Sequence, residues 1–254
     1  MEYLEVNSII EFGSDSNANE STVKNNRVWQ AARTDVFIVI EEEIAFCQAQ
    51  SKAKIFVDDC EIGKTFSAKH LSRTRKNCFY IDGSQATTKI LFTKLLAQTI
   101  GLECFGRYAE IKADIKRFLR TLKNPIVIID DGGYLKDEVF VDLNEYWNST
   151  EGYCGWYMIG DDSLKNKIEK SIRSKKPGFR AFLSRWSSKF SRITPVGEKE
   201  KILFYRKLIT DVLSVNLSDA NKISDLVTRC ITKDENGNIG GLRRAESLMI
   251  LCNY

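Results

Sequence analysis

The segment that most constrains the fold covers residues 55–71, IFVDDCEIGKTFSAKHL. A short apolar run leads into a loop that ends in Gly63-Lys64-Thr65, and a helix-forming stretch follows at once. In a P-loop, backbone N–H groups at a helix start hold phosphates, the lysine reaches the β and γ oxygens, and the hydroxyl coordinates Mg²⁺. We therefore predict that Lys64 contacts the phosphates of ATP and that Thr65 is a Mg²⁺ ligand; the alternative is a helix start with a chance GKT. The residues expected to line the nucleotide are Asp59, Cys60, Glu61, Ile62, Gly63, Lys64, Thr65 and Phe66.

The loop departs from the usual P-loop pattern at its first position, where Asp58 replaces a glycine. With Asp59 and Glu61 it brings three carboxylates close to the expected phosphates. These charges oppose nucleotide binding unless they face away from it, and a residue with a Cβ also restricts the loop's conformations. Weak or conditional ATP binding is the expectation.

A second motif follows the breaker Asn124-Pro125, where four apolar residues, IVII, end in Asp130 and Asp131. This is the form of a Walker B strand, which delivers a carboxylate to the end of a buried strand. We expect Asp130 to complete the Mg²⁺ shell and Asp131 to orient the attacking water. ATPases of this kind usually place glutamate there, so the shorter aspartate predicts slow hydrolysis. An acidic strand cap is the alternative interpretation.

Two more segments carry candidate catalytic residues. The apolar run 156–159 is followed by Gly160-Asp161-Asp162, and either aspartate is a candidate to sense the γ-phosphate or hold the water. Near the C-terminus, GGLRRA has the form of a lid-helix start with a sensor arginine, which would place Arg243 over the phosphates. A plain turn and a surface arginine are the alternatives.

Strand-like and helix-like segments alternate through the first two thirds of the chain, which predicts a parallel, doubly wound sheet. After Thr194-Pro195 only helices are expected. The prediction is thus an α/β P-loop NTPase with a three-layer core at 29–195, a small helical lid at 196–254 and a flexible arm at 1–28. The expected strands are 54–57, 78–81, 126–129, 156–159 and 190–193. The expected helices are 35–50, 64–74, 87–100, 107–122, 136–148, 198–214, 217–232 and 240–252.

Charge is unevenly distributed along the chain. The net charge is only +4, but residues 165–192 carry ten Lys and Arg against a single acid, Glu169. The rest of the chain is therefore net acidic. A basic block in such a protein predicts a polyanionic partner, although a solvated helix face would have the same composition.

The sequence indicates neither a membrane protein nor a disulfide-stabilised protein. No apolar run approaches the roughly 18 residues of a membrane span, and the N-terminus lacks the basic region of a signal peptide. The seven cysteines include no CxxC pair and are odd in number, so neither a zinc site nor a disulfide framework is expected. These features predict a cytoplasmic protein with reduced, mostly buried thiols and no membrane partner.

Over residues 29–250 the sequence resembles the AAA+ ATPases of DNA transposition, typified by the phage Mu transposition protein B and related transposon regulators. The segments that carry the resemblance are DDCEIGKTFSAKHL, CFYIDGSQATTK, GRYAEIKADIKRFLRTLKNPIVIIDDGG, LNEYWNSTEGYCGWYMIGDDSLKNKIEKSI and GGLRRAES. The resemblance implies ATP-dependent assembly on double-stranded DNA as a ring or filament, with recruitment or stimulation of a transposase. Many relatives begin with a helix-turn-helix domain, for which the residues before Trp29 are too few.

The resemblance also implies roles for particular residues. ATP would lie between subunits, and a neighbouring subunit would supply an arginine finger. Arg185 matches its place before the fifth strand, with Arg173 as the alternative. DNA contact would come from the inner face of the assembly, near Lys89 and Arg107, through backbone phosphates.

Two other functions remain open. One is a nucleotide-binding scaffold with little or no hydrolysis, which Asp58, Glu61 and Asp131 would favour. The other is an AAA+ ATPase that loads a helicase, with the same core and a different partner. The sequence leaves open the partner, the target preference and the oligomer geometry.

Overall fold

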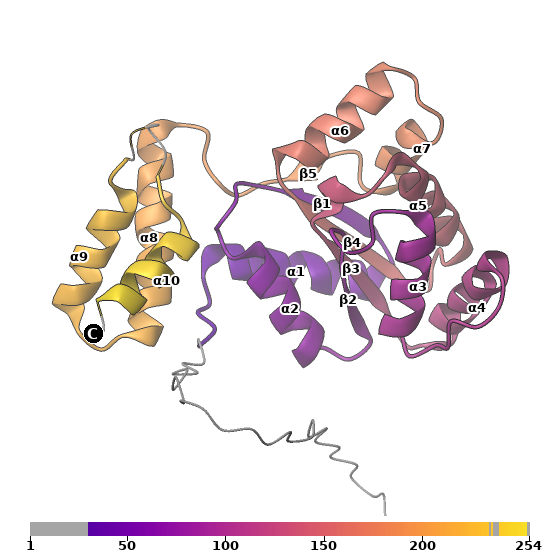
Figure 1. Cartoon of the computed structure of the whole chain (residues 1–254), viewed down its shortest axis with the longest axis horizontal. Helices are drawn as coiled ribbons and strands as arrows, with labels where there is room; N and C mark the ends of the chain where they lie inside the picture. The colour runs from indigo at the N-terminus through magenta and orange to yellow at the C-terminus, as the bar shows by residue number, and fades with distance from the viewer. Residues whose placement is uncertain (1–29, 234, 236–238, 253–254) are drawn as a thin grey trace, which may run out of the picture.

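The computed structural model describes residues 30–233, 235 and 239–252. The expected arm, 1–28, lies outside them. The centre of the described structure is a five-stranded parallel sheet with the strand order β2-β3-β4-β1-β5 (Figure 1). The strands are β1 (Ala53–Val57), β2 (Cys78–Asp82), β3 (Ile126–Asp130), β4 (Gly155–Gly160) and β5 (Phe190–Ser191). The α/β prediction is confirmed, and β4 lies between β3 and β1 in the sheet.

Helices cover both faces of the sheet because alternate strand residues point to opposite sides. Phe56 and Ile128 face the layer that contains α1 (Asp35–Gln50) and α2 (Lys64–Thr74). Ile55 and Ile129 face the opposite layer. That layer consists of α3 (Lys89–Thr99), α4 (Tyr108–Thr121), α5 (Asp137–Ser149), α6 (Asp162–Arg173) and α7 (Phe179–Arg185).

The lid is a separate group of three helices beside the sheet (Figure 1). It contains α8 (Glu198–Asn216), α9 (Ala220–Ile231) and α10 (Leu242–Leu251), packed around a small core that includes Ile209, Leu226 and Met249. The segment 192–197, called the hinge below, joins β5 to α8. Through Tyr205 and Leu208, α8 also packs on the α1–α2 layer of the core.

The sequence-based element assignment missed two helices and overextended one strand. Residues 162–173 and 179–185 are helical, and a 3-10 turn, η1 (Gly132–Tyr134), follows β3. Leu164, Ile168 and Ile172 recur at a spacing of four within the basic block, so the signal for α6 was present but masked by charge. The fifth strand is Phe190–Ser191, because the chain turns into the hinge after it.

Two further features concern the described residues. None of their helices has the length and apolar character needed to cross a membrane. All seven cysteines are free thiols, of which Cys60 and Cys252 are exposed.

Candidate nucleotide-binding site

The loop between β1 and α2 has the backbone of a phosphate-binding turn. Glu61 and Gly63 adopt left-handed conformations, with φ of 61° and 93°. A Cβ at Gly63 would also lie 3.2 Å from Leu242 Cδ1, so glycine suits both the conformation and the contact. Within the described part of the chain, the N–H groups of Gly63, Lys64 and Thr65 have no acceptor. These free donors at the start of α2 can bind an anion.

Lys64 is held inside this loop by two of its carbonyls. Its Nζ donates to the main-chain oxygens of Asp58 and Asp59, at 2.6 and 2.5 Å. Burial lowers the pKa of Lys64, and nearby acidic groups, Asp161 and Asp130 among them, oppose that shift. The ammonium is thus already placed in the loop where phosphates would meet it.

Asp130 and Asp131 end β3 with different surroundings. Asp130 is buried and accepts hydrogen bonds from the Tyr80 hydroxyl and from the Asp131 N–H, both at 3.0 Å. Asp131 follows in a left-handed conformation, with φ of 51°. Partial burial, then the charges of Asp130 and Asp82, raise the pKa of Asp131. The Asp131 carboxylate therefore binds a proton more readily than an ordinary aspartate, as suits a residue that would orient a water molecule.

A cavity of about 380 Å³ brings the predicted residues together from three parts of the chain. Loop residues 60–67 and the acids Asp131 and Asp161 form one side, and the lid contributes Leu242 and Arg243. The remaining wall comes from the segment that leads into α1, including Thr34 and Phe37. Its lining combines polar groups of the loop with apolar side chains such as Phe37, Val212 and Leu242, a mixture that suits a phosphate chain and an aromatic base.

Asp161 and Asp162 take different positions at the start of α6. Asp161 caps the helix, accepting the Ser163 N–H at 2.9 Å, and lies 3.8 Å from the Cys60 sulfur. Burial alone would raise the pKa of Asp161, but the hydrogen bonds from Ser163 lower it, so the carboxylate stays charged. Asp162 does not line the loop cavity and instead lies 3.5 Å from a nitrogen of Arg192.

The carboxylates that made the loop sequence unusual face the lid. Asp58 is fully buried and accepts the N–H groups of Ile193 and Thr194 at 2.7 and 3.0 Å. Asp59 forms ion pairs with Arg192, at 2.6 Å, and with Lys201. Both carboxylates therefore point to the hinge and the lid, where N–H groups and cations offset their charge.

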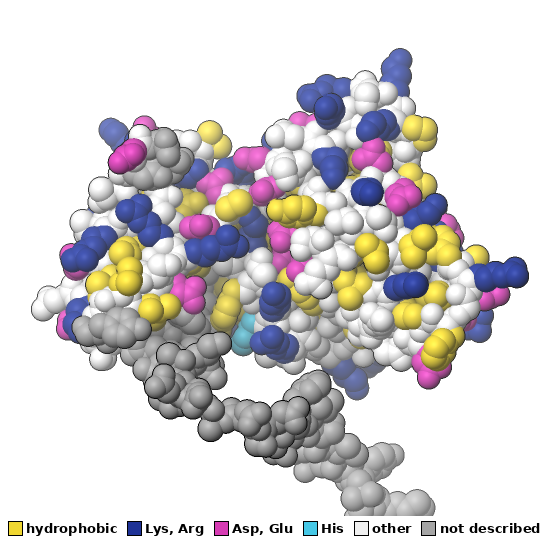
Figure 2. Space-filling view, in the orientation of Figure 1, with side chains coloured by type: hydrophobic (Ala, Val, Ile, Leu, Met, Phe, Trp, Pro, Cys, Tyr) yellow, Lys and Arg dark blue, Asp and Glu magenta, His cyan; other side chains and the backbone are white. Residues whose placement is uncertain are grey.

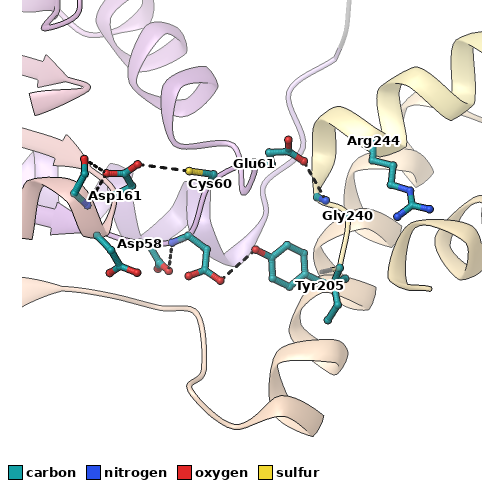
Figure 3. A pocket seen from close by; sticks show the side chains of 12 residues that line it. Asp58, Cys60, Glu61, Asp161, Tyr205, Gly240 and Arg244 are labelled. Atoms are coloured by element: carbon teal, nitrogen blue, oxygen red, sulfur yellow. Dashed lines mark hydrogen bonds between the residues drawn. The ribbon is translucent and has the colours of Figure 1, made fainter. Parts of the chain in front are cut away.

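Glu61 also contacts the lid, accepting the Gly241 N–H at 3.2 Å, while its carbonyl accepts the Leu242 N–H at 2.8 Å. In Figure 3 the dashed lines run from the loop to Tyr205 and to the chain beside Gly240. A second cavity, of about 540 Å³, is lined by the loop residues 58–61, by 161–163 at the start of α6, and by lid residues that include Tyr205 and Arg244.

The residues assigned by resemblance lie away from the loop cavity. Arg185, at the end of α7, donates to Asn148 Oδ1 at 2.7 Å and packs on the Trp147 ring, and neither it nor Arg173 lines the two cavities described. Lys89 begins α3, 3.9 Å from Glu138, and Arg107 precedes α4 on the surface.

Sequence comparisons agree with this geometry. Residues 61–168 match the family model described as an AAA domain. The fold is that of the AAA+ P-loop ATPases. No curated protein matches the chain in sequence.

Three solved structures share this AAA+ fold. The ORC1 protein of Aeropyrum pernix, in complex with DNA, has a TM-score of 0.61 and 12% identity over 89% of this chain and 61% of its own. Cdc6p of Pyrobaculum aerophilum has a TM-score of 0.54 and 15% identity over 78% and 54%. The Aeropyrum pernix ORC2 protein, in ADPNP–ADP complexes, has a TM-score of 0.60 and 12% identity over 90% and 65%. The chain thus spans about 54 to 65% of these proteins.

Several residues at the AAA+ site were missed from the sequence. Arg192, Lys201 and Tyr205 contact the loop acids, and Thr34 and Phe37 line the cavity. Arg192 was counted only as part of the basic block. No local motif marks these positions, because their role depends on contacts with residues more than a hundred positions away, or on a wall built from the start of α1.

Proposed function

We propose that the protein is an ATP-dependent, DNA-binding ATPase that assembles on duplex DNA in its ATP form and recruits or stimulates a transposase. The observation that carries the nucleotide part is the loop cavity, where Lys64, Asp131, Asp161 and Arg243 surround free N–H donors. The AAA+ fold supports the same conclusion.

ATP with Mg²⁺ fits the residues present. The Thr65 hydroxyl has no hydrogen-bond partner among the described residues. The buried Asp130 carboxylate lies at the end of β3. Hydroxyl and carboxylate oxygens are ligands that Mg²⁺ prefers. Bound there, the cation would neutralise phosphate charge during cleavage of the γ-phosphate, while Lys64 and Arg243 hold the phosphate chain.

Hydrolysis is assigned to the acids at the strand ends. Asp131 orients the attacking water, and Asp161, already ionised at the end of β4, contacts the γ-phosphate side or holds the same water. A neighbouring subunit supplies Arg185 as the finger, with Arg173 as the alternative. Because an aspartate reaches one methylene less far than a glutamate, turnover is slow and the ATP state is long-lived.

DNA binding is supported by the surface charge. Lys89 and Arg107 flank α3 and α4, and the same region exposes Phe105, which is 82% accessible. A second basic area covers α6 and α7, where Figure 2 shows dark blue side chains gathered at the top of the core. Its exposed cations without an ion pair in the described residues are Lys170, Arg173, Lys175, Arg180 and Lys189. Such contacts reach phosphates and weaken as salt rises.

A second candidate function is the loading of a replicative helicase. It is favoured by the folds of the archaeal ORC and Cdc6 proteins, one of which was solved in complex with DNA. The two functions share the nucleotide site and differ in partner. Co-purification of the tagged protein with the transposase or the helicase encoded near it separates them.

The proposed ATPase activity is tested by two measurements in the presence of Mg²⁺: an ATP binding isotherm and steady-state phosphate release. Lys64→Ala is expected to weaken ATP binding by about ten- to a hundredfold, because charge-assisted hydrogen bonds to phosphates are lost. Arg73→Ala, which removes an exposed cation on the same helix with no ion pair in the described structure, is the matched control and should behave as wild type. ATP binding without any turnover would favour the scaffold function, and no ATP binding would reject the proposal.

A further inference from the structure

The P-loop contacts the lid at both of its ends. Asp58 accepts the N–H groups of hinge residues 193 and 194, and Asp59 pairs with Arg192 and with Lys201 of α8. Two residues later, Glu61 accepts the N–H groups of Gly241, from its side chain, and Leu242, from its carbonyl. A single short loop therefore contacts the entry to the lid and the start of its last helix.

Arg192 is the centre of the contact at the lid entry. Its guanidinium lies 2.6 Å from Asp59 Oδ1, 3.7 Å from Asp58 Oδ1 and 3.5 Å from Asp162 Oδ1, measured from three different nitrogens. The planar fork of arginine suits such simultaneous contacts with several carboxylates. Since Asp162 begins α6, the loop, the hinge and the core all meet at one side chain.

We propose that Asp58 and Asp59, acting through Arg192, are positioning residues that join the nucleotide loop to the lid, so that the lid responds when the loop takes up nucleotide. This inference rests on the proposed function of the site. A glycine at position 58 has no carboxylate to accept the N–H groups of residues 193 and 194. The aspartate that stands in place of the usual glycine therefore connects the loop to the hinge.

Lys64 supplies the link from nucleotide to this connection. Its ammonium donates to the carbonyls of Asp58 and Asp59, the two residues whose side chains contact the hinge. Phosphates that attract the ammonium change these hydrogen bonds and thereby the backbone that carries both carboxylates. At the other end of the loop, the Leu242 N–H donates to the Glu61 carbonyl. The next residue, Arg243, lines the 380 Å³ cavity.

Amide hydrogen exchange of the full-length protein tests this connection at residues 193–194 and 241–242, with no nucleotide and with saturating ATP and Mg²⁺. Arg192→Gln removes the ion pairs at a side chain that is already 33% exposed. Asp58→Gly restores the usual glycine and leaves two buried donors unsatisfied. Lys199→Gln is the matched control, because Lys199 is exposed on α8 and has no ion pair in the described structure.

In wild type, ATP is expected to slow exchange at both lid segments. In Arg192→Gln and Asp58→Gly, exchange without nucleotide should be about tenfold faster at 193–194, and ATP should no longer slow it at 241–242. If Asp58→Gly fails to fold, Arg192→Gln and Lys201→Gln decide the question.

Lid exchange in Arg192→Gln that matches Lys199→Gln in both conditions would overturn the connection. That result is distinct from failure of the proposed function. Calorimetry would then still find ATP binding that Lys64→Ala loses, whereas failure of the function means that wild type binds no ATP. In that case the lid response to nucleotide is overturned as well.

Discussion

At the residue scale, Asp131 determines how fast the proposed reaction runs. It extends from the end of β3 in a left-handed conformation into the loop cavity, next to the buried Asp130. The side chain is one methylene shorter than the glutamate usual at this position. In the proposed reaction we expect the charge of Asp131 to be needed for catalysis and its short side chain to limit the rate.

Asp131→Glu is expected to raise the turnover number, and Asp131→Asn to lower it by roughly a hundredfold or more, as is typical when a general base is removed. Both variants should still bind ATP, because Lys64 and Thr65 are unchanged. Single-turnover hydrolysis, paired with an ATP binding isotherm, measures the two effects separately. Equal rates in wild type and Asp131→Asn would assign the water to another residue, with Asp161 next in position.

The sequence was sufficient for residues within a motif and insufficient for their distant partners. Lys64, Asp131 and Arg243 were predicted from local patterns, and the structure brings all three to one cavity. The direction of the Asp58 carboxylate was not predictable, because it is set by the N–H groups of Ile193 and Thr194. A sequence motif identifies a residue but does not predict its side-chain contacts with residues that are distant in the sequence.

At the scale of elements, α4 is joined to α5 by a charged cluster on the core side opposite the lid. Lys112 is buried and lies 2.7 Å from Asp142 and 2.5 Å from Glu145, which also pairs with Lys116. Burial would lower the pKa of Lys112, but hydrogen bonds to the two acids outweigh it and raise the pKa. Burial would likewise raise the pKa of Glu145, yet the two lysines lower it below its ordinary 4.5.

A lowered carboxyl pKa adds stability above pH 4.5, and this stability is lost as the pH falls through the pKa of the folded state. Glu145→Gln should therefore lower the free energy of unfolding at pH 7 by only about 0.5 kcal/mol, since the side chain is half exposed. The difference from wild type should vanish below the folded pKa of Glu145. Urea unfolding at a series of pH values from 7 downward measures how the difference shrinks.

The control for this prediction is Glu103→Gln, an exposed glutamate with no ion pair in the described structure, which should leave stability unchanged at every pH. A difference between wild type and Glu145→Gln that stays constant as the pH falls through the acid range would contradict the assignment. It would then reflect packing of the side chain.

Elements were predictable where apolar spacing was regular. The sequence gives α1 and α2 their observed bounds, because apolar residues recur at helical spacing between clear breaks. It missed α6, where lysines and arginines separate the apolar residues, and the seven-residue α7, and it extended β5 beyond Ser191. Charge density thus concealed helices whose apolar side chains pack beneath a basic surface.

At the scale of the whole molecule, the nucleotide cavity and the basic surface are separate features. The nucleotide cavity lies between core and lid, whereas the basic areas around α3, α4, α6 and α7 lie on the core. A switch requires that nucleotide in the cavity changes DNA binding at the basic areas. The loop-to-lid contacts and the ATP-bridged assembly are the two routes by which this occurs in the proposal.

The most direct test is fluorescence anisotropy of labelled duplex DNA titrated with the protein, in ATP, in ADP and without nucleotide, at two salt concentrations. We expect ATP to strengthen DNA binding cooperatively, higher salt to weaken it, and Lys64→Ala to bind DNA equally in all three conditions. Equal binding by wild type with ATP, ADP and no nucleotide would contradict this expectation, because the P-loop would then have no influence on DNA.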